Sequence, residues 1–302
     1  MVEANYKAVS MEVSSHGIKL KRTHGIDFDL SIFTNITRDH FDFHKNFKHY
    51  VKIKKSLFDQ LDEHATALIN GDDEYADYIG DNIKAQVITF GLDNENIVTA
   101  ENIRHKDLKT FYDLVIHREI KTEYAHLKPM SIPIEITLPG RHNIYNTLGA
   151  CTAGLLLGLS PEQVQNISVF TGIWRRFQII YDSDFIVIDD CAHNPGSYNA
   201  VFEAVQNLNY NNLYIVNAIR GNRGTKINQD NAEVFANWVQ KLENAHLMVT
   251  NCSELVKEDD IVYPEEEKIF LDTLREQGAN FEHQNKLAPF YDQILEKVQP
   301  GD

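Results

Sequence analysis

The spacing of apolar and polar residues predicts two strands and a helix near the start of the chain. The runs 7–13 (KAVSMEV) and 28–36 (FDLSIFTNI) are rich in apolar and β-branched residues, which is typical of buried strands. Residues 46–61 instead carry apolar side chains at helical intervals. The chain is therefore expected to begin with a strand, a second strand and a helix.

The predicted helix places a lysine on its apolar face. Lys54 falls on the same side as Phe47 and Phe58, so we expect it to point inward, whereas Lys52 and Lys55 are expected to point toward water. Burial beside aromatic rings favours the neutral form of a lysine amine.

The rest of the chain continues the pattern and predicts an α/β fold in two parts. We expect strands at 64–70 and 86–92, an antiparallel edge sheet within 97–139 and an apolar helix within 139–160. After a boundary at 172–173, strands and helices alternate, which predicts a Rossmann-like parallel sheet. The elements expected there are a hairpin that turns at 182–184, strands at 212–219 and 246–250, and helices at 197–208, 228–242, 265–277 and 287–298.

Composition and charge exclude several classes of protein. The formal net charge of -15 argues against a nucleic-acid partner, because phosphate binding needs a basic face. Cys151, Cys191 and Cys252 form no C-x-x-C pair, so neither a zinc ribbon nor a disulfide framework is expected. The sequence has no apolar run of about 18 residues and no signal peptide. We expect a cytoplasmic protein with no membrane partner.

Polar side chains gather where the first two predicted strands end. Residues 12–15 (EVSS) lie at the end of one strand, and residues 35–40 (NITRDH) lie at the end of the other. In an open α/β sheet, ligands bind in the crevice beyond the carboxyl ends of the strands. The two segments are therefore expected to face one site.

Four motifs in this region resemble those of the Mur ligases, ATP-dependent enzymes that join an amino acid to a carboxylate. They are E-V-S-S-H-G from residue 12, R-x-x-G-I-x-F-D at 22–29, F-T-N-I-T-R-D-H-F-D-x-H at 33–44 and Y-x-x-x-K-x-x-L-F at 50–58. They are most similar to the branch that adds the third residue of UDP-N-acetylmuramoyl peptides. The resemblance implies an α/β chain with part of the P-loop-type Mur ligase central domain at 1–173 and the Rossmann-like C-terminal domain at 174–302.

The resemblance also implies a magnesium site. Glu12 and His40 would be metal ligands, and Lys54 would carry a carbamate that serves as a further ligand and a catalytic group. Magnesium prefers oxygen ligands, and a carbamate turns the lysine amine into a carboxylate. Taken alone, an inward lysine more often snorkels and Asp39 beside His40 more often caps a helix, but the joint spacing favours the metal site. Ser14 and Arg22 would contact the nucleotide-sugar substrate.

Further site residues are implied in the second half. Asn143 and Asn146 form the N-x-x-N of the family at the start of the apolar helix, where helix N-termini favour anions. Arg176, in R-R-F-Q, would reach the ATP phosphates. Asp190 and His193, in D-C-A-H-N-P, would bind the ribose and take part in catalysis. Capping, a surface arginine and a strand-end turn are the plainer alternatives, which the order and spacing of the motifs outweigh.

A basic loop supplies the expected substrate site. Arg220 and Arg223 flank glycines after the next predicted strand, where they could hold a substrate carboxylate. The amino-acid specificity motif D-N-P-R is absent, and 250–254 (TNCSE) stands in its place, so the amino acid is not predicted.

One expected element has no match. The phosphate-loop pattern G-x-x-x-x-G-K-[ST] does not occur in the sequence. Phosphoryl transfer depends on such a loop and on magnesium. We therefore expect the polypeptide to be inactive, or nearly so, unless the loop is supplied as a separate chain.

The sequence thus predicts a ligase of peptidoglycan precursor synthesis. It would use ATP and Mg²⁺ to join an amino acid to a UDP-MurNAc-peptide through an acyl phosphate. A folylpolyglutamate synthase-like ligase is an alternative, because D-x-A-H-N-P and R-F-Q are also similar to that relative. A noncatalytic nucleotide-binding homologue is a second alternative.

Overall fold

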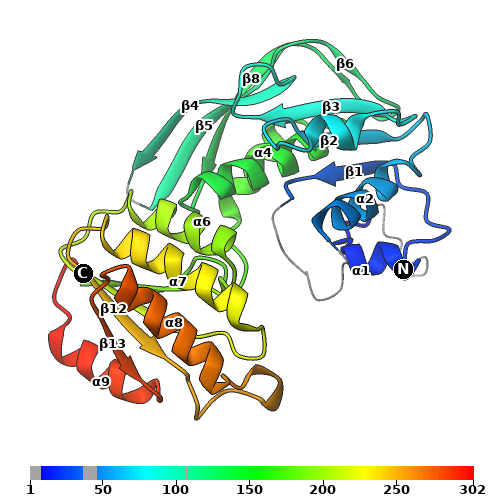
Figure 1. The fold of residues 1–302 in the computed structure, drawn as a ribbon. Helices are drawn as coiled ribbons and strands as arrows, with labels where there is room; N and C mark the ends of the chain where they lie inside the picture. The colour runs from blue at the N-terminus through cyan, green and yellow to red at the C-terminus, as the bar shows by residue number, and fades with distance from the viewer. Residues whose placement is uncertain (1–7, 37–45, 107) are drawn as a thin grey trace, which may run out of the picture. The chain divides into compact units, whose positions relative to one another are not determined.

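The computed structural model describes residues 8–36, 46–106 and 108–302 (Figure 1). The chain divides into two compact units that interleave in sequence. The first unit comprises Met1–Arg104, Phe111–Glu135 and Ile144–Ser168, and the second comprises His105–Thr110, Ile136–Asn143 and Val169–Asp302. The predicted domain boundary at residue 173 stays a prediction.

A six-stranded sheet, in the order β1-β2-β3-β4-β5-β8, organises the first part of the chain. Pairing is parallel from β1 through β4. The short strands β6 and β7 form a separate antiparallel pair. The strands are β1 Leu30–Phe33, β2 Thr66–Asn70, β3 Gln86–Gly91, β4 Val98–Lys106, β5 Lys109–Ile116, β6 Ile120–Lys121, β7 His126–Leu127 and β8 Met130–Ile136.

The helices of this part begin at recognisable caps. The Asn46 side chain accepts a hydrogen bond from the His49 N–H at 2.9 Å, which starts α2 (Phe47–Phe58) where the sequence predicts a helix. Its buried Phe58 packs edge-on against Phe33 of β1, with ring centroids 6.2 Å apart. The other helices are α1 Ser15–Lys19, α3 Ala76–Gly80, α4 Arg141–Leu156, α5 Pro161–Val164 and the 3₁₀ turn Gln165–Val169.

The strand predicted at 7–13 is wrong over its described part. Residues 8–13 form no strand, and Ser14 then caps α1 by accepting the Gly17 N–H at 3.1 Å. Val9 and Met11 are exposed, and Val13 at the end of the run packs partly buried against the core, so most of this face has no core to cover.

The second unit contains the predicted Rossmann-like parallel sheet, with strand order β11-β12-β13. In Figure 1 helices α6, α7 and α8 lie side by side next to it. Between these helices Phe235 packs edge-to-face with Phe202 and at a tilt against Phe270. The strand β13 was not predicted. The elements are β9 Gln178–Asp182, β10 Ile186–Asp189, α6 Pro195–Val205, β11 Leu213–Ala218, α7 Thr225–Val239, β12 Ala245–Thr250, the 3₁₀ turn Glu258–Asp260, α8 Pro264–Glu276, β13 Phe281–Gln284 and α9 Ala288–Lys297.

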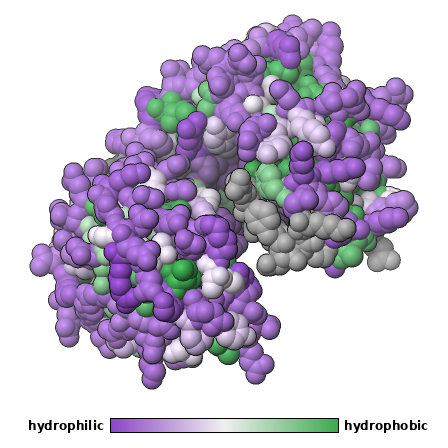
Figure 2. All heavy atoms as spheres, in the orientation of Figure 1, coloured by the Kyte–Doolittle hydropathy of each residue, from purple (hydrophilic) through white to green (hydrophobic). Residues whose placement is uncertain are grey.

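Hydrophilic side chains predominate on the face drawn in Figure 2, and apolar ones form small separate patches. Within the residues that the structure describes, no helix is long and apolar enough to cross a bilayer.

Candidate functional site

The turn after β2 holds the segment that leads toward the predicted metal site. The Asn70 side chain donates to the Thr34 carbonyl at 2.7 Å, and the Asp73 carboxylate accepts the Ile36 N–H at 2.9 Å. Both contacts lie at the carboxyl ends of β1 and β2, where ligands collect in α/β sheets. The N-G-D-D turn therefore fixes the backbone of the F-T-N-I motif.

Asp72 of the same turn contacts the β3–β4 loop and α4. Its carboxylate accepts the Leu92 N–H at 2.6 Å, the Asn96 amide at 2.7 Å and the Tyr145 hydroxyl at 2.6 Å. Burial by itself raises the pKa of Asp72, but these hydrogen bonds outweigh it and lower the pKa below its ordinary value of 3.8. Asp72 is therefore an ionised brace between β3 and α4.

The predicted magnesium ligands are not assembled by the described residues. Glu12 is exposed, Lys54 is half-buried with its Nζ 5.8 Å from the centre of the Tyr50 ring, and His40 lies outside the described residues. No group of three His, Cys, Asp or Glu side chains that could hold a metal occurs in the part of the chain that the structure describes. The metal set stays a prediction.

The neighbouring lysines differ from each other. Lys52 is exposed as predicted, but the prediction for Lys55 is wrong, because its side chain is only 12% exposed. Its amine donates to Asp59 Oδ1 and to the Asp81 carbonyl, both at 2.7 Å. Two acceptors at the end of α2 and beyond α3 therefore draw this side chain away from water.

The predicted nucleotide-sugar contacts both lie near α1. Ser14 uses its hydroxyl oxygen as the cap of that helix, which leaves the hydroxyl proton available to a ligand. Arg22 is exposed.

Asp190 ties together two motifs of the second unit. One carboxylate oxygen accepts the Phe177 N–H at 2.7 Å and the other accepts the Ala192 N–H at 2.6 Å. Arg175 and Phe177 have φ angles of 57° and 47°, in the left-handed region that non-glycine residues seldom adopt. Such backbone strain is found mainly where surrounding contacts enforce it. The segment 175–177 therefore presents the exposed Arg176 beside the strand end that carries Asp190.

His193 and the helix that follows complete this strand end. The His193 Nδ1 lies 2.9 Å from the Cys191 carbonyl, which can only accept, so Nδ1 carries a proton and the neutral ring would offer Nε2 as an acceptor. Asn194 and Ser197 then form a capping box that starts α6. The N-terminus of this helix favours an anion.

The sequence missed His142, which lies in the first turn of α4. Burial lowers its pKa, and the nearby Asp190 carboxylate only partly opposes that effect, so the imidazole is neutral at pH 7. Beside it Asn143 is buried and donates to the Pro139 carbonyl at 2.8 Å, whereas Asn146 is exposed. The signal that could have found His142 is its position in P-G-R-H-N, next to the predicted N-x-x-N.

The arginines of the predicted basic loop lie beside a carboxylate that precedes α8. Arg223 Nη2 lies 3.1 Å from Asp260 Oδ1, and Arg220 Nη2 lies 3.8 Å from the same oxygen. Arg220 and Asp190 both act electrostatically on the buried Tyr198 hydroxyl, which donates to Asn217 at 3.0 Å. The structure thus gathers Arg176, Asp190, His193, Arg220 and Arg223 in one unit.

Family models match both parts of the chain. The Mur ligase middle domain matches residues 1–154, and the Mur ligase glutamate ligase domain matches residues 175–302. The chain belongs to the Mur ligase family. This confirms the resemblance and the α/β class predicted from the sequence.

The relatives of this Mur ligase chain are longer than it is. The UDP-N-acetylmuramoyl-L-alanyl-D-glutamate--2,6-diaminopimelate ligase of Bacillus velezensis is 32% identical over 221 residues, which are 70% of this chain and 43% of that one. The Clostridium acetobutylicum ligase 1 of the same name is 31% identical over 273 residues, 85% of this chain and 53% of that one. The chain therefore spans about half the length of the curated relatives it matches.

A solved structure shares the fold. The MurF ligase of Thermotoga maritima in complex with ADP superposes with a TM-score of 0.65 at 13% identity, covering 96% of this chain and 60% of that one.

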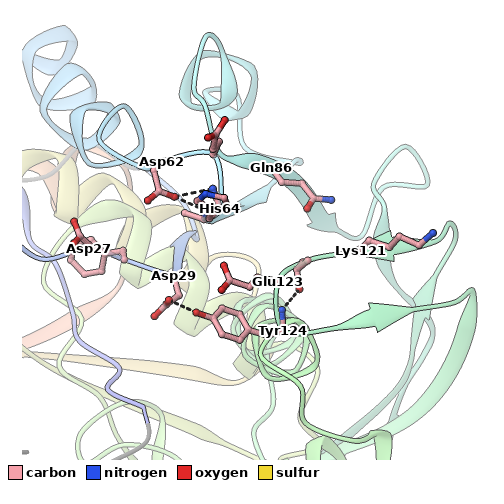
Figure 3. Close-up of a pocket in the computed structure, with 12 residues that line it drawn as sticks. Asp27, Asp29, Asp62, His64, Gln86, Lys121, Glu123 and Tyr124 are labelled. Atoms are coloured by element: carbon pink, nitrogen blue, oxygen red, sulfur yellow. Dashed lines mark hydrogen bonds between the residues drawn. The ribbon is translucent and has the colours of Figure 1, made fainter.

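A pocket of about 650 Å³ lies at the amino ends of the strands of the six-stranded sheet (Figure 3). It is lined at the amino ends of β1 and β2 by Asp29 and Asp62, and by Glu123 and Tyr124 from the β6–β7 turn. The Tyr124 hydroxyl donates to Asp29 at 2.5 Å. None of the predicted site residues lines this pocket, and ligands of α/β sheets bind at the opposite, carboxyl edge.

Proposed function

We propose that this chain supplies nucleotide- and amino-acid-binding residues to an ATP-dependent carboxylate–amine ligase of peptidoglycan precursor synthesis. Support comes from the family, from the names of the relatives and from one structural observation. Asp190 joins the backbone before the D-C-A-H-N-P helix to the backbone that carries Arg176. This contact supports a site in which Arg176 supplies a cation, Asp190 a carboxylate for the ribose and α6 its N-terminus, a set of groups that would suit a nucleotide phosphate.

The proposed chemistry proceeds in two steps. The γ-phosphoryl group of ATP passes to the carboxylate of a UDP-MurNAc-peptide, which gives an acyl phosphate and ADP. The amine of an amino acid then attacks the acyl carbon, forms the amide and releases phosphate. Arg176 would neutralise phosphate charge, Asp190 would accept from ribose hydroxyls, and His193 Nε2 could accept a proton or a hydrogen bond.

Magnesium would supply charge neutralisation of the phosphates when bound. Glu12, His40 and carbamylated Lys54 are the residues proposed to hold it.

A phosphate loop is the other requirement of this chemistry. The 302 residues contain no match to its pattern. We propose ligase turnover for these residues together with such a loop, whether it belongs to the same polypeptide or to a separate chain. The amino acid that is added remains open, because TNCSE stands where the specificity motif is expected.

Calorimetric titration of the purified chain with ADP tests the nucleotide site. Arg176→Gln and Asp190→Asn should each weaken binding about tenfold or more, because each removes a charged hydrogen-bonding group. Arg175→Gln is the matched control, since Arg175 pairs with Asp189 (Nε to Oδ2, 3.3 Å) and should leave affinity unchanged. Equal binding by all variants, or none by folded wild-type chain, would contradict the proposal.

A further inference from the structure

The basic loop Arg220–Gly224 between β11 and α7 is clamped from one side. At Gly221 a Cβ atom would overlap the carbonyl groups of Asp260 and Ile261, so only glycine allows this approach. The loop therefore packs backbone to backbone against the segment that precedes α8.

A buried carboxylate on α8 binds the backbone of this loop. Glu266 is 2% exposed. Its Oε1 accepts the N–H groups of Arg223 at 2.8 Å and Gly224 at 2.6 Å, and its Oε2 accepts those of Asn222 at 2.9 Å and Tyr263 at 3.1 Å. Three successive loop N–H groups and the start of α8 thus converge on one side chain.

Glu266 is ionised in this position. Burial raises its pKa, but the four backbone hydrogen bonds outweigh burial and lower it below the ordinary value of 4.5. A buried charge is stable only when it is fully hydrogen-bonded, as here.

The Glu266 carboxylate occupies the position that a bound anion would otherwise take. Successive loop N–H groups at a helix N-terminus are the usual cradle of a phosphate. At α7 this cradle already holds Glu266, although the glycine-rich sequence RGNRG suggests a phosphate loop. Only the arginine side chains of the loop are left to meet a ligand.

Those side chains are arranged around a single carboxylate. Asp260 Oδ1 lies within 3.1 Å of Arg223 Nη2 and 3.8 Å of Arg220 Nη2. One carboxylate can therefore contact both guanidinium groups at once, which is how an amino-acid carboxylate would be held.

We propose that Glu266 is a positioning residue for the amino-acid substrate: it anchors the backbone of 222–224 so that Arg220 and Arg223 converge on one substrate carboxylate. This inference rests on the proposed function, in which those arginines bind the incoming amino acid. Glu266 does not touch the substrate and acts through the loop.

Hydrogen exchange measured by mass spectrometry tests the anchor in the whole chain. Glu266→Gln should speed exchange in the peptide 220–226 at least about tenfold, since an amide offers one acceptor oxygen and sets its own N–H groups against the backbone donors. Peptides from β11 and β12 should be unchanged. Glu265→Gln is the matched control, because Glu265 is exposed on the same helix. Unchanged exchange in Glu266→Gln would overturn the proposal.

Chemical rescue separates anchoring from general destabilisation. Glu266→Ala leaves space for a small carboxylate, so added acetate should restore slow exchange in 220–226, whereas chloride at equal ionic strength should restore less. A loss of protection throughout the second unit that acetate does not reverse would mean that Glu266 is only a folding residue, and would overturn the positioning role.

Titration with 2,6-diaminopimelate, the amino acid for which the relatives are named, and with lysine tests the link to substrate. Arg223→Ala should abolish binding with 222–224 still protected, and Glu266→Gln should weaken binding at least about tenfold. The wild-type chain could bind neither amino acid while Glu266→Gln still loses protection of the loop. That result would overturn the substrate role proposed for the arginines, but the role of Glu266 as an anchor of the loop would hold. Wild-type affinity in Glu266→Gln would overturn the positioning role alone.

Discussion

At the scale of single residues, three acidic side chains hold backbone in place instead of facing solvent. Asp72 braces the turn after β2, Asp190 straps Phe177 to the α6 entry, and Glu266 anchors the basic loop. Each of these carboxylates accepts backbone N–H groups with both of its oxygens. A net charge of -15 therefore includes carboxylates that organise the site as well as carboxylates that solvate the surface.

Substitution of Asp72 should show this role as a pH-dependent stability difference. Asp72→Ala strands the Leu92 N–H and the Tyr145 hydroxyl, so the free energy of unfolding at pH 7 should fall by about 2 to 4 kcal/mol. Because folding lowers the pKa of Asp72, its contribution is present above the ordinary value of 3.8 and is lost as pH falls below it.

Denaturant unfolding at several pH values measures this difference. The gap between wild type and Asp72→Ala should narrow at low pH. Asp93→Ala, an exposed change in the neighbouring loop, should stay within about 0.5 kcal/mol of wild type. A gap that is the same at every pH would show that the ionised form of Asp72 does not matter.

At the scale of elements, α2 shows how neighbours override helical position. The helix begins at its predicted cap and buries its predicted apolar face, as Tyr50, Val51 and Phe58 show. Lys55 nevertheless turns inward to Asp59 and to a carbonyl beyond α3. Helical periodicity assigns a face, but acceptors brought by another element decide where a long side chain ends.

Lys55→Met should therefore destabilise the first unit. The change leaves the Asp81 carbonyl without its lysine partner and removes the ion pair with Asp59, so the free energy of unfolding should fall by about 1 to 2 kcal/mol. Lys52→Met on the exposed face of the same helix is the control and should be near neutral. Chemical denaturation followed by circular dichroism compares the two; equal stability would refute the role of Lys55.

At the scale of the whole molecule, short segments from the middle of the chain belong to the C-terminal unit. His105–Thr110 and Ile136–Asn143 join Val169–Asp302. Thr110 donates to the Leu138 carbonyl at 3.3 Å, and Thr137 donates to the Phe170 carbonyl at 3.0 Å. The start of α4, with His142 and Asn143, is thereby held with Asp190 in one unit.

Gly140→Ala tests that attachment. A Cβ at Gly140 would lie 2.8 Å from His142 and 3.0 Å from Ala204, and the φ of +99° disfavours any side chain, so stability should fall by about 2 kcal/mol or more. Gly278→Ala has a φ of +72° with open space around it, and should cost only about 1 to 2 kcal/mol. Hydrogen exchange should show the extra loss in α6 for Gly140→Ala; a loss no larger than that of Gly278→Ala would contradict the packing.

The sequence alone determined the alternation of strands and helices and the family of this chain. The elements follow from a local signal, the spacing of apolar residues, and the family follows from the order of the motifs along the chain. Both can be read without knowing the tertiary structure. It located α2, α4 and the strands β11 and β12 of the second unit to within a few residues, but not β13. It also named Arg176, Asp190 and Arg223, whose proposed roles remain to be tested.

Only the tertiary structure decided which groups those residues meet. Glu266 accepts N–H groups from residues 42 to 44 positions earlier, and Asp72 meets Tyr145 across 73 positions. Over residues 8–13 it showed no strand, because Val9 and Met11 are exposed, and it brought His142 toward Asp190. Hydrogen-bond partners and burial depend on how distant segments pack, and periodicity along the chain carries no information about that packing.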